Sequence, residues 1–143
     1  MKRAVLAAVI VFAGCATPVE RHTEPGDPTA KLPFSDVVRA GNLLFQSGKI
    51  GLQPGKFEVV PGGIQAETRR ALEIIQESFA RQGVGMDRVV KCTVFLADMK
   101  EWAAMNEIYV QFFPAGKPAR SALGASGLAL GARVEIECLA ALP

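Results

Sequence analysis

Histidine and the common catalytic motifs are scarce or missing in this chain, and their scarcity excludes several classes of function. The 143 residues include one histidine, His22, which argues against histidine-based acid–base catalysis and against histidine-ligated metal sites. The sequence contains no CxxC pair, no HExxH motif, no Walker loop and no GxSxG elbow. Any chemistry must therefore rely on carboxylates, arginines and backbone groups.

A strong excess of either charge is also missing. The 16 Lys and Arg residues and 14 Asp and Glu residues give a formal net charge of +2, and Lys2 and Arg3 alone account for this excess. The nearly neutral remainder lacks the basic footprint with which proteins bind phosphate backbones, so we expect no nucleic-acid partner. Half of the residues are hydrophobic and 21% are charged, which excludes a disordered chain.

The first fifteen residues are typical of a bacterial export signal. Lys2 and Arg3 precede ten apolar residues, 4–13, a run too short to span a hydrocarbon core about 30 Å thick. The segment 12–15, Phe-Ala-Gly-Cys, resembles a lipobox, so we interpret 1–14 as a signal peptide that is cleaved before a lipidated Cys15. We expect an exported lipoprotein in the cell envelope, in the outer membrane or periplasm of a Gram-negative cell. Its contact with the membrane is then limited to the lipid anchor.

The next segment, 15–31, predicts a polar tether. It holds three prolines, a glycine and mixed charges without an apolar period, and His22 is expected there as a solvated residue. The remaining residues, 32–143, are enough for one domain with a modest core.

Hydrophobic periodicity within 32–143 predicts an α+β domain. Gly41-Asn42 lies between two short apolar segments and indicates a β-hairpin. Helical spacing of apolar residues predicts a helix that begins near Ile64 and ends at Gly83, and a second helix with a core stripe. The second helix is expected to start at an Asp98 N-cap, with Glu101 completing a capping box. Its expected core stripe consists of Trp102, Met105, Tyr109 and Phe112. The expected strands cover 37–40, 43–47, 57–60, 89–97, 120–125 and 133–141. This order favours a mixed β-sheet with two helices packed on one face.

Two cysteines fall on predicted strands, and their state stays open at this level. Cys92 and Cys138 are either two small buried hydrophobic residues or, in an exported protein, a disulfide. A disulfide requires that the two Cα atoms approach within about 7 Å.

From about Leu32 to the C-terminus, the chain resembles the RidA family, the YjgF-type enamine/imine deaminases. Four blocks carry this resemblance: 47–50 (Ser-Gly-Lys-Ile), 90–99, 105–109 (Met-Asn-Glu-Ile-Tyr) and 117–121 (Lys-Pro-Ala-Arg-Ser). Glu135 follows fifteen residues after Arg120, as the pattern requires. The resemblance implies a chorismate-mutase-like α+β fold and a homotrimer with its sites between subunits. It also implies hydrolysis of 2-imino acids to 2-oxoacids and ammonia without a metal or a cofactor.

The resemblance assigns a role to each site residue. Arg120 matches the arginine that pairs with the substrate carboxylate, and Glu135 matches the acid that positions the attacking water. The expected substrate-binding residues are Phe34, Gly48, Lys49, Asn106 and Ala122. Without the resemblance, Arg120 could equally be an interface ion-pair residue, Glu135 an ordinary strand residue and Asn106 a cap.

Three of these positions depart from the usual family pattern. Phe34 stands where a tyrosine is usual, Lys49 where a glutamine is usual, and Ala122 where many members have a cysteine. A phenyl ring keeps an apolar wall but loses a hydroxyl, and a lysine either adds anion affinity or lies on the rim. We therefore keep two hypotheses, a hydrolytic imine deaminase and a catalytically weak or inactive envelope module that binds small carboxylates.

Overall fold

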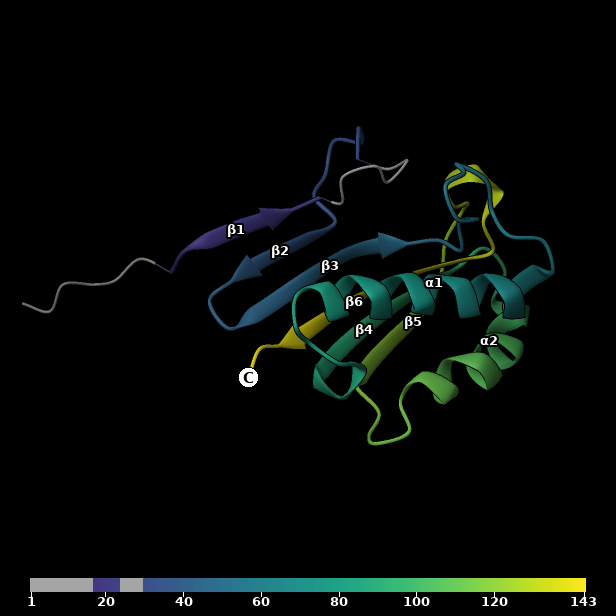
Figure 1. Ribbon diagram of the computed structural model, residues 1–143. Coiled ribbons are helices and arrows are strands. Elements are labelled where there is room, and N and C mark those ends of the chain that lie inside the picture. The colour runs from purple at the N-terminus through teal and green to yellow at the C-terminus, as the bar shows by residue number, and fades with distance from the viewer. Residues whose placement is uncertain (1–16, 24–29) are drawn as a thin grey trace, which may run out of the picture.

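A six-stranded mixed sheet with two helices on one face forms the core of the computed structural model, which describes residues 17–23 and 30–143 (Figure 1). The strands run in the spatial order β1-β2-β3-β6-β4-β5. Neighbouring strands pair antiparallel, except that β4 and β5 are parallel. The strands are β1 (Val19–His22), β2 (Val37–Ala40), β3 (Leu43–Lys49), β4 (Val89–Leu96), β5 (Ala119–Gly124) and β6 (Val134–Ala141). This architecture confirms the predicted α+β fold.

Helices α1 (Gly63–Arg81) and α2 (Trp102–Tyr109) lie together on the same side of the sheet (Figure 1). Helix α1 buries one apolar stripe against the strands, and each fully buried Leu, Ile or Phe side chain contributes about 1.5–3 kcal/mol. The stripe contains Ile64, Ala71, Leu72, Ile75 and Phe79. The helix ends as predicted, because Gly83 takes a left-handed φ of 73° and Val84 N–H donates to the carbonyl of Phe79 at 3.0 Å.

Side chains of the central strands alternate between the helix-covered face and the opposite, open face of the sheet. Along β6, Val134, Ile136, Cys138 and Ala140 are buried beneath the helices, whereas Glu135, Glu137 and Leu139 are half-buried on the open face. Strand β4 follows the same alternation, with Cys92, Val94 and Leu96 in the core. Whether a residue is at an odd or even position along its strand therefore determines which face of the sheet its side chain lies on.

The first hairpin confirms one prediction, and the loop after it corrects another. Strands β2 and β3 pair antiparallel around Gly41, which has a φ of 61°. Strand β3 continues to Lys49 through an irregularity in its pairing with β6. The predicted strand over 57–60 does not form and is reduced to an isolated bridge between Leu52 and Val59. The turn at 54–55 leaves too little chain for a ladder, and Phe57 is exposed.

The N-terminal region differs from the predicted tether. Residues Val19–His22 form β1, which pairs antiparallel with β2 at the edge of the sheet. The side chains of β1 are exposed except for the half-buried His22. Because this strand is held by backbone pairing, it carries no hydrophobic alternation that sequence reasoning could detect. Residues 1–16 and 24–29, including the predicted signal peptide and Cys15, lie outside the described residues. Among 17–23 and 30–143, no helix is long and apolar enough to cross a membrane.

The start of α2 contains half of the predicted capping box. Asp98 Oδ1 accepts the N–H of Lys100 at 2.9 Å at the start of a short 3₁₀ turn, Met99–Glu101, that leads into the helix. The carboxylate of Glu101 does not return to Asp98; it pairs with the guanidinium of Arg133 at 2.8 Å. A distant partner with opposite charge has therefore replaced the local backbone contact.

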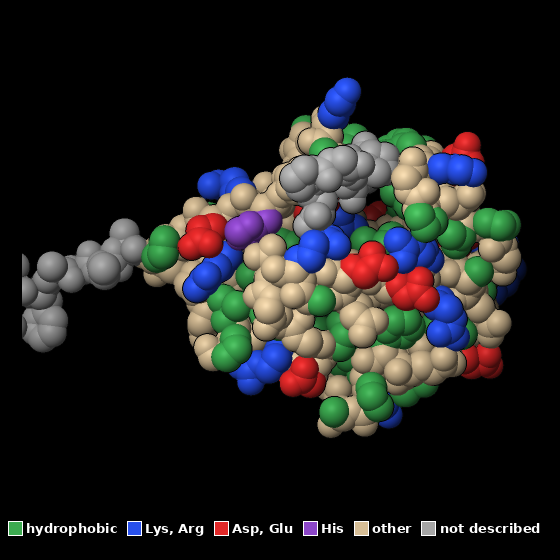
Figure 2. Space-filling model, in the orientation of Figure 1, with side chains coloured by type: hydrophobic (Ala, Val, Ile, Leu, Met, Phe, Trp, Pro, Cys, Tyr) green, Lys and Arg blue, Asp and Glu red, His purple; other side chains and the backbone are tan. Residues whose placement is uncertain are grey.

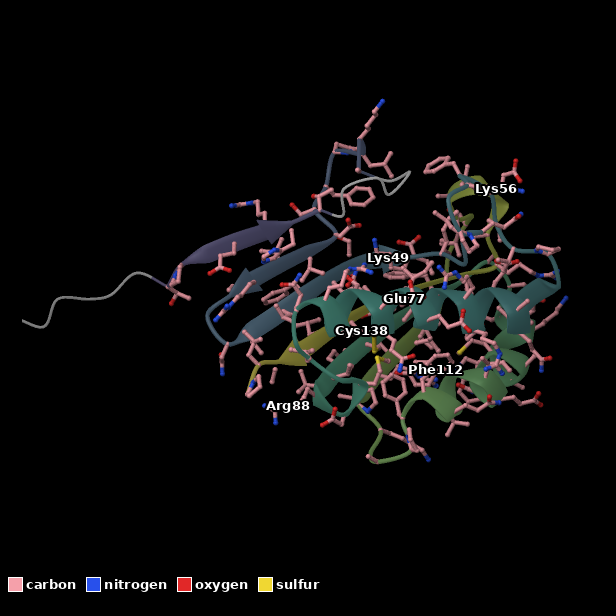
Figure 3. All side chains as sticks on the ribbon, viewed as in Figure 1. Lys49, Lys56, Glu77, Arg88, Phe112 and Cys138 are labelled. Carbon is pink, nitrogen blue, oxygen red and sulfur yellow. A yellow bond between two sulfur atoms is a disulfide. The ribbon has the colours of Figure 1, made fainter. Side chains whose placement is uncertain are left out.

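The structure also decides the state of the two cysteines. Cys92 and Cys138 are direct partners across β4 and β6, with Cα atoms 4.1 Å apart, and their sulfurs form a disulfide. Figure 3 labels Cys138 at this bond, on the side of the sheet that α1 covers. Interpreting them as two separate buried thiols is therefore wrong.

Candidate active site

Arg120 is held at the edge of the sheet by a contact with helix α2. It lies near the start of β5, in register with Cys92 of β4, and therefore points to the helix-covered face. Its Nη1 donates to Oδ1 of Asn106 at 2.6 Å. Two residues further along β5, Ala122 lies on the same face and packs against the core. We call Arg120, Asn106 and Ala122 the arginine half-site.

Two aromatic rings of α2 flank the same guanidinium. Its carbon lies 4.7 Å from the ring centroid of Tyr109 and 5.9 Å from that of Trp102, distances at which a cation is attracted to a π face. Burial raises the pKa of Tyr109 to about 12, although the nearby charge of Arg120 lowers it, so the phenol stays neutral. Within the part of the chain that the structure describes, Arg120 has no carboxylate partner. Its remaining N–H groups are therefore available to an anion.

Glu135 lies on the open face and is packed against a glycine. It is opposite Phe95 of β4, and its carboxyl group extends over Gly48, at the irregular end of β3. A Cβ added at Gly48 would overlap Oε1 of Glu135 and would lie 2.8 Å from its carboxyl carbon. Only glycine leaves this space, which is a physical reason for the glycine that the sequence analysis singled out. We call Glu135 and Gly48 the glutamate half-site.

The surroundings of Glu135 disfavour the charged form of its carboxyl group. Burial raises its pKa, and the like charge of Glu137, two residues along the same face, raises it further. Among the described residues, the side chain of Glu135 forms no hydrogen bond and no ion pair. A carboxyl group without partners and with a raised pKa is suited to exchange a proton with a water molecule.

Lys49 does not have either role that the sequence suggested. Its side chain is 9% exposed, and Nζ forms an ion pair with Oδ1 of Asp36 (Lys49 is labelled in Figure 3). The cation is therefore neither on the rim nor free for an external anion. Burial of an amine requires a partner of this kind, because an uncompensated charge away from water is costly.

The two residues that follow Phe34 are hydrogen-bonded to Ser47, which precedes Gly48 in the chain. Ser47 N–H donates to the carbonyl of Asp36 at 3.0 Å, and Ser47 Oγ donates to the carbonyl of Ser35 at 2.6 Å. These bonds hold segment 34–36 against the end of β3. Phe34 is 46% exposed, so its ring is an accessible apolar surface.

The two half-sites point to opposite faces of the sheet. Arg120 and Glu135 are separated by two strand spacings and three residues along the strands, which corresponds to about 14 Å between their backbones. The intervening sheet prevents both side chains of one chain from contacting the same small molecule. The structure therefore brings together the members of each half-site but does not join the two halves within one chain.

Sequence reasoning missed the two aromatic neighbours of Arg120 because it placed them in the core. Tyr109 is buried, but Trp102 is 43% exposed, and both contact the guanidinium. The signal was their spacing from Asn106, at four residues before and three after, which puts all three on one helix face. No three His, Cys, Asp or Glu side chains cluster as metal ligands in 17–23 and 30–143.

Comparisons with known proteins place this geometry in a family. Residues 25–142 match the family described as endoribonuclease L-PSP. The chain is 40% identical over 113 residues to the mouse 2-iminobutanoate/2-iminopropanoate deaminase, which covers 79% of the chain and 84% of that protein. It is 39% identical over 115 residues to the chloroplastic Reactive Intermediate Deaminase A of Arabidopsis thaliana, covering 80% of the chain but 62% of that longer protein.

A solved structure shows the same fold. The crystal structure of E. coli TdcF with bound serine matches with a TM-score of 0.79 and 30% sequence identity, covering 87% of this chain and 100% of that one. Together, the matched residues span nearly the whole described domain. The chain therefore belongs to the endoribonuclease L-PSP family, the RidA family that its sequence resembles.

Proposed function

We propose that this protein hydrolyses 2-imino acids. Water adds to the imine carbon, the C–N bond of the resulting carbinolamine breaks, and a 2-oxoacid and ammonia are released. An imine carbon is already electrophilic, so the reaction needs orientation and a positioned water more than a strong nucleophile. The mouse and Arabidopsis relatives, whose names state imine or reactive-intermediate deamination, support this reaction.

The observation that carries the proposal is the unpaired edge of Arg120. Its guanidinium is half-buried, makes one hydrogen bond to Asn106 and meets no carboxylate among the described residues. A planar guanidinium binds a carboxylate through two parallel N–H···O bonds, each stronger than a neutral hydrogen bond. The substrate carboxylate is the natural occupant of this edge.

Glu135 acts on the water in this proposal. Its carboxyl group has no partner in the described chain, and its raised pKa brings proton exchange closer to neutral pH. As a carboxylate it accepts a proton from the attacking water, and as an acid it returns a proton to the leaving ammonia. Gly48 provides the space in which this carboxyl group lies.

A homotrimer with sites between subunits would join the two half-sites. They face opposite sides of one sheet, so a complete site requires Arg120 from one copy and Glu135 from another. The open face also presents apolar side chains, with Phe45 41% and Leu123 43% exposed and Phe95 and Leu139 half-buried beside them. An apolar sheet face of this kind is more favourably buried against another copy than left in water.

Binding without turnover is the second candidate function. Phe34 has no hydroxyl with which to order a water, although its exposed ring keeps an apolar surface. The TdcF structure holds serine, which shows that a relative of this fold retains a small carboxylate. RNA cleavage, the activity in the family's name, has less support. Basic and acidic side chains are interleaved on the face shown in Figure 2 rather than gathered into a basic strip.

The decisive experiment compares the parent protein with Arg120→Ala. An amino-acid oxidase generates 2-iminobutanoate in situ, ammonia release is followed over time, and binding of 2-oxobutanoate is measured by calorimetry. We expect the parent to accelerate ammonia release and the variant to lose both the acceleration and the binding. Binding by the parent without acceleration would favour the carboxylate-binding module, and equal activity in both proteins would reject the proposed site.

We also propose that the protein is exported and anchored through Cys15. The disulfide between Cys92 and Cys138 supports an oxidising compartment, because cytoplasmic proteins rarely keep such bonds. Labelled palmitate is expected to enter the parent protein but not Cys15→Ser, measured after expression in a bacterial host. Label that persists in the variant would contradict lipidation at this residue.

A further inference from the structure

One face of α2 forms an aromatic trough around the guanidinium of Arg120. Trp102, Asn106 and Tyr109 share this face, and the two rings are seven residues apart, about 10.5 Å along the helix axis. The guanidinium carbon lies 4.7 Å from one ring and 5.9 Å from the other, while Nη1 donates to the amide oxygen between them. Three side chains of one short helix therefore converge on one cation of a neighbouring strand.

The two rings differ in their exposure. Tyr109 is 6% exposed, and its ring packs against Phe113 with centroids 4.8 Å apart, so its position is fixed by the core. Trp102 is 43% exposed and is absent from the core cluster. Outside the core cluster, the contact of Trp102 that bears on the candidate site is the one with this cation.

We propose that Trp102 and Tyr109 are positioning residues that hold Arg120 in one orientation for carboxylate binding. This proposal rests on the proposed function and names the device that preorganises its carboxylate site. An arginine on an edge strand can adopt many rotamers, and all except the binding rotamer are lost when a ligand binds. This loss of conformational entropy weakens binding. The two rings restrict the plane of the guanidinium, and Asn106 fixes one N–H within that plane. The remaining edge then meets a carboxylate without reorganisation.

The ring of Tyr109, and not its hydroxyl, performs this task. Its Oη is buried and has no hydrogen-bond partner among the described residues, so it orders no neighbour of Arg120. A neutral phenol also leaves the cation uncompensated, whereas a phenolate would compete with the substrate carboxylate. Phenylalanine at position 109 should therefore keep the positioning, and leucine should lose it.

The experiment uses two pairs of variants, Tyr109→Leu with Tyr109→Phe and Trp102→Ala with Trp102→Phe. For each, kcat and KM are measured with 2-iminobutanoate generated in situ, together with the Kd for 2-oxobutanoate and the melting temperature. We expect KM and Kd to rise about tenfold in the leucine and alanine variants, with kcat nearly unchanged, because the cation–π contacts are lost. The phenylalanine variants should recover most of the affinity. Val110→Ala, an exposed apolar residue that follows α2, is the matched control.

The outcomes separate the two levels of the proposal. If the parent neither hydrolyses the imine nor binds 2-oxobutanoate, the proposed function fails and the positioning role fails with it. If the parent is active and KM and Kd do not change in Tyr109→Leu and Trp102→Ala, the positioning role alone is overturned. A lower melting temperature with unchanged Kd also overturns it, because that is the result of a purely structural role.

Discussion

The arginine half-site and the glutamate half-site are built in opposite ways. Arg120 is surrounded by contacts: a hydrogen bond to Asn106 and two aromatic rings on a helix. Glu135 is defined by the absence of a side chain at Gly48 and by a neighbouring like charge, and its carboxyl group forms no hydrogen bond within the described residues. The first half is fixed by packing, and the second depends on free space.

This difference indicates how each half can fail. The contacts that fix the arginine half-site also contribute to the stability of the fold. A substitution among them should therefore lower both the free energy of unfolding and the affinity for ligand. A half-site that depends on free space can lose its function while the fold remains intact. The two halves face opposite sides of the sheet, and the proposed function therefore takes them from different copies.

The largest expected effect concerns this division between copies. Arg120→Ala and Glu135→Gln should each lower kcat/KM by about 100-fold or more, since each removes one charged group of the site. When the two inactive variants are mixed, unfolded and refolded together, intact sites should form wherever an unaltered Arg120 meets an unaltered Glu135. In a closed ring with random assembly, about a quarter of the sites are then complete.

Ammonia release by the refolded mixture measures this recovery, with each variant refolded alone as its control. A mixture that stays as inactive as its components would contradict sites shared between copies, provided that the mixture forms the same oligomer as the parent.

The next effect concerns stability and should spare the chemistry. The disulfide joins β4 to β6 and closes a loop with a sequence separation of 46. Replacing both Cys92 and Cys138 by alanine should lower the free energy of unfolding by about 2–4 kcal/mol, because the unfolded chain is no longer constrained. Chemical denaturation measures this loss, and reduced parent protein is the comparison. Under native conditions kcat/KM should change little. A large loss of activity would show that the disulfide also shapes the site.

Gly48→Ala should lower activity and leave stability almost unchanged, the reverse of the disulfide variant. The added Cβ displaces the carboxyl group of Glu135, the flexible end of a side chain, so the backbone need not move. We expect kcat to fall about tenfold, because a displaced acid no longer orients the water, while stability changes by less than about 1 kcal/mol. Gly116→Ala is the matched control, since a Cβ there meets no atom within 4 Å. Full activity in Gly48→Ala would show that the space over this glycine is dispensable.

The smallest effect is electrostatic. Glu137 contributes to the raised pKa of Glu135, after burial, so Glu137→Gln should move that pKa down toward its ordinary value. If catalysis needs the carboxylate, kcat/KM declines as pH falls through this pKa, and in the variant this decline should occur at lower pH. Because the pKa of Glu135 is raised in the folded protein, ionisation of this carboxyl group opposes folding. Its contribution to the free energy of unfolding therefore falls as pH rises through that pKa. pH–rate profiles of the parent and of Glu137→Gln test the shift, with the exposed Glu58→Gln as control. Coincident profiles would exclude Glu135 as the titrating group.

Much of the fold could be predicted because its elements carry strong local signals. The apolar stripe from Ile64 to Phe79 and the alternation around Ile136 each identify an element and its buried side. Strand β1 could not be predicted, since its exposed side chains hold no pattern and its pairing with β2 depends on the backbone. The exposure of Trp102 was also hidden, because helical spacing shows a shared face but not what covers that face.

The members of the candidate site could be named from the family resemblance, but their arrangement could not. That Arg120 and Glu135 face opposite sides follows from the registers of β5 and β6 against β4, and both registers are tertiary facts. The partner of Lys49 was equally inaccessible, because Asp36 lies thirteen residues away, before a hairpin. Local sequence determines which face of an element is apolar, whereas long-range pairing determines which groups meet.

The bond between Cys92 and Cys138 also makes the chain between them a closed covalent ring. Asn106, Arg120 and Glu135 all belong to this ring, and one of its exposed parts is the segment 114–117 that leads into β5. A protease that cuts once in this segment opens the ring but releases nothing, since the two pieces stay joined through sulfur. Such a nicked protein would run as one species on a gel without reductant and as two species with it. A single break in this segment would therefore leave the arginine half-site attached to the rest of the molecule, which would matter in the protease-containing envelope proposed above.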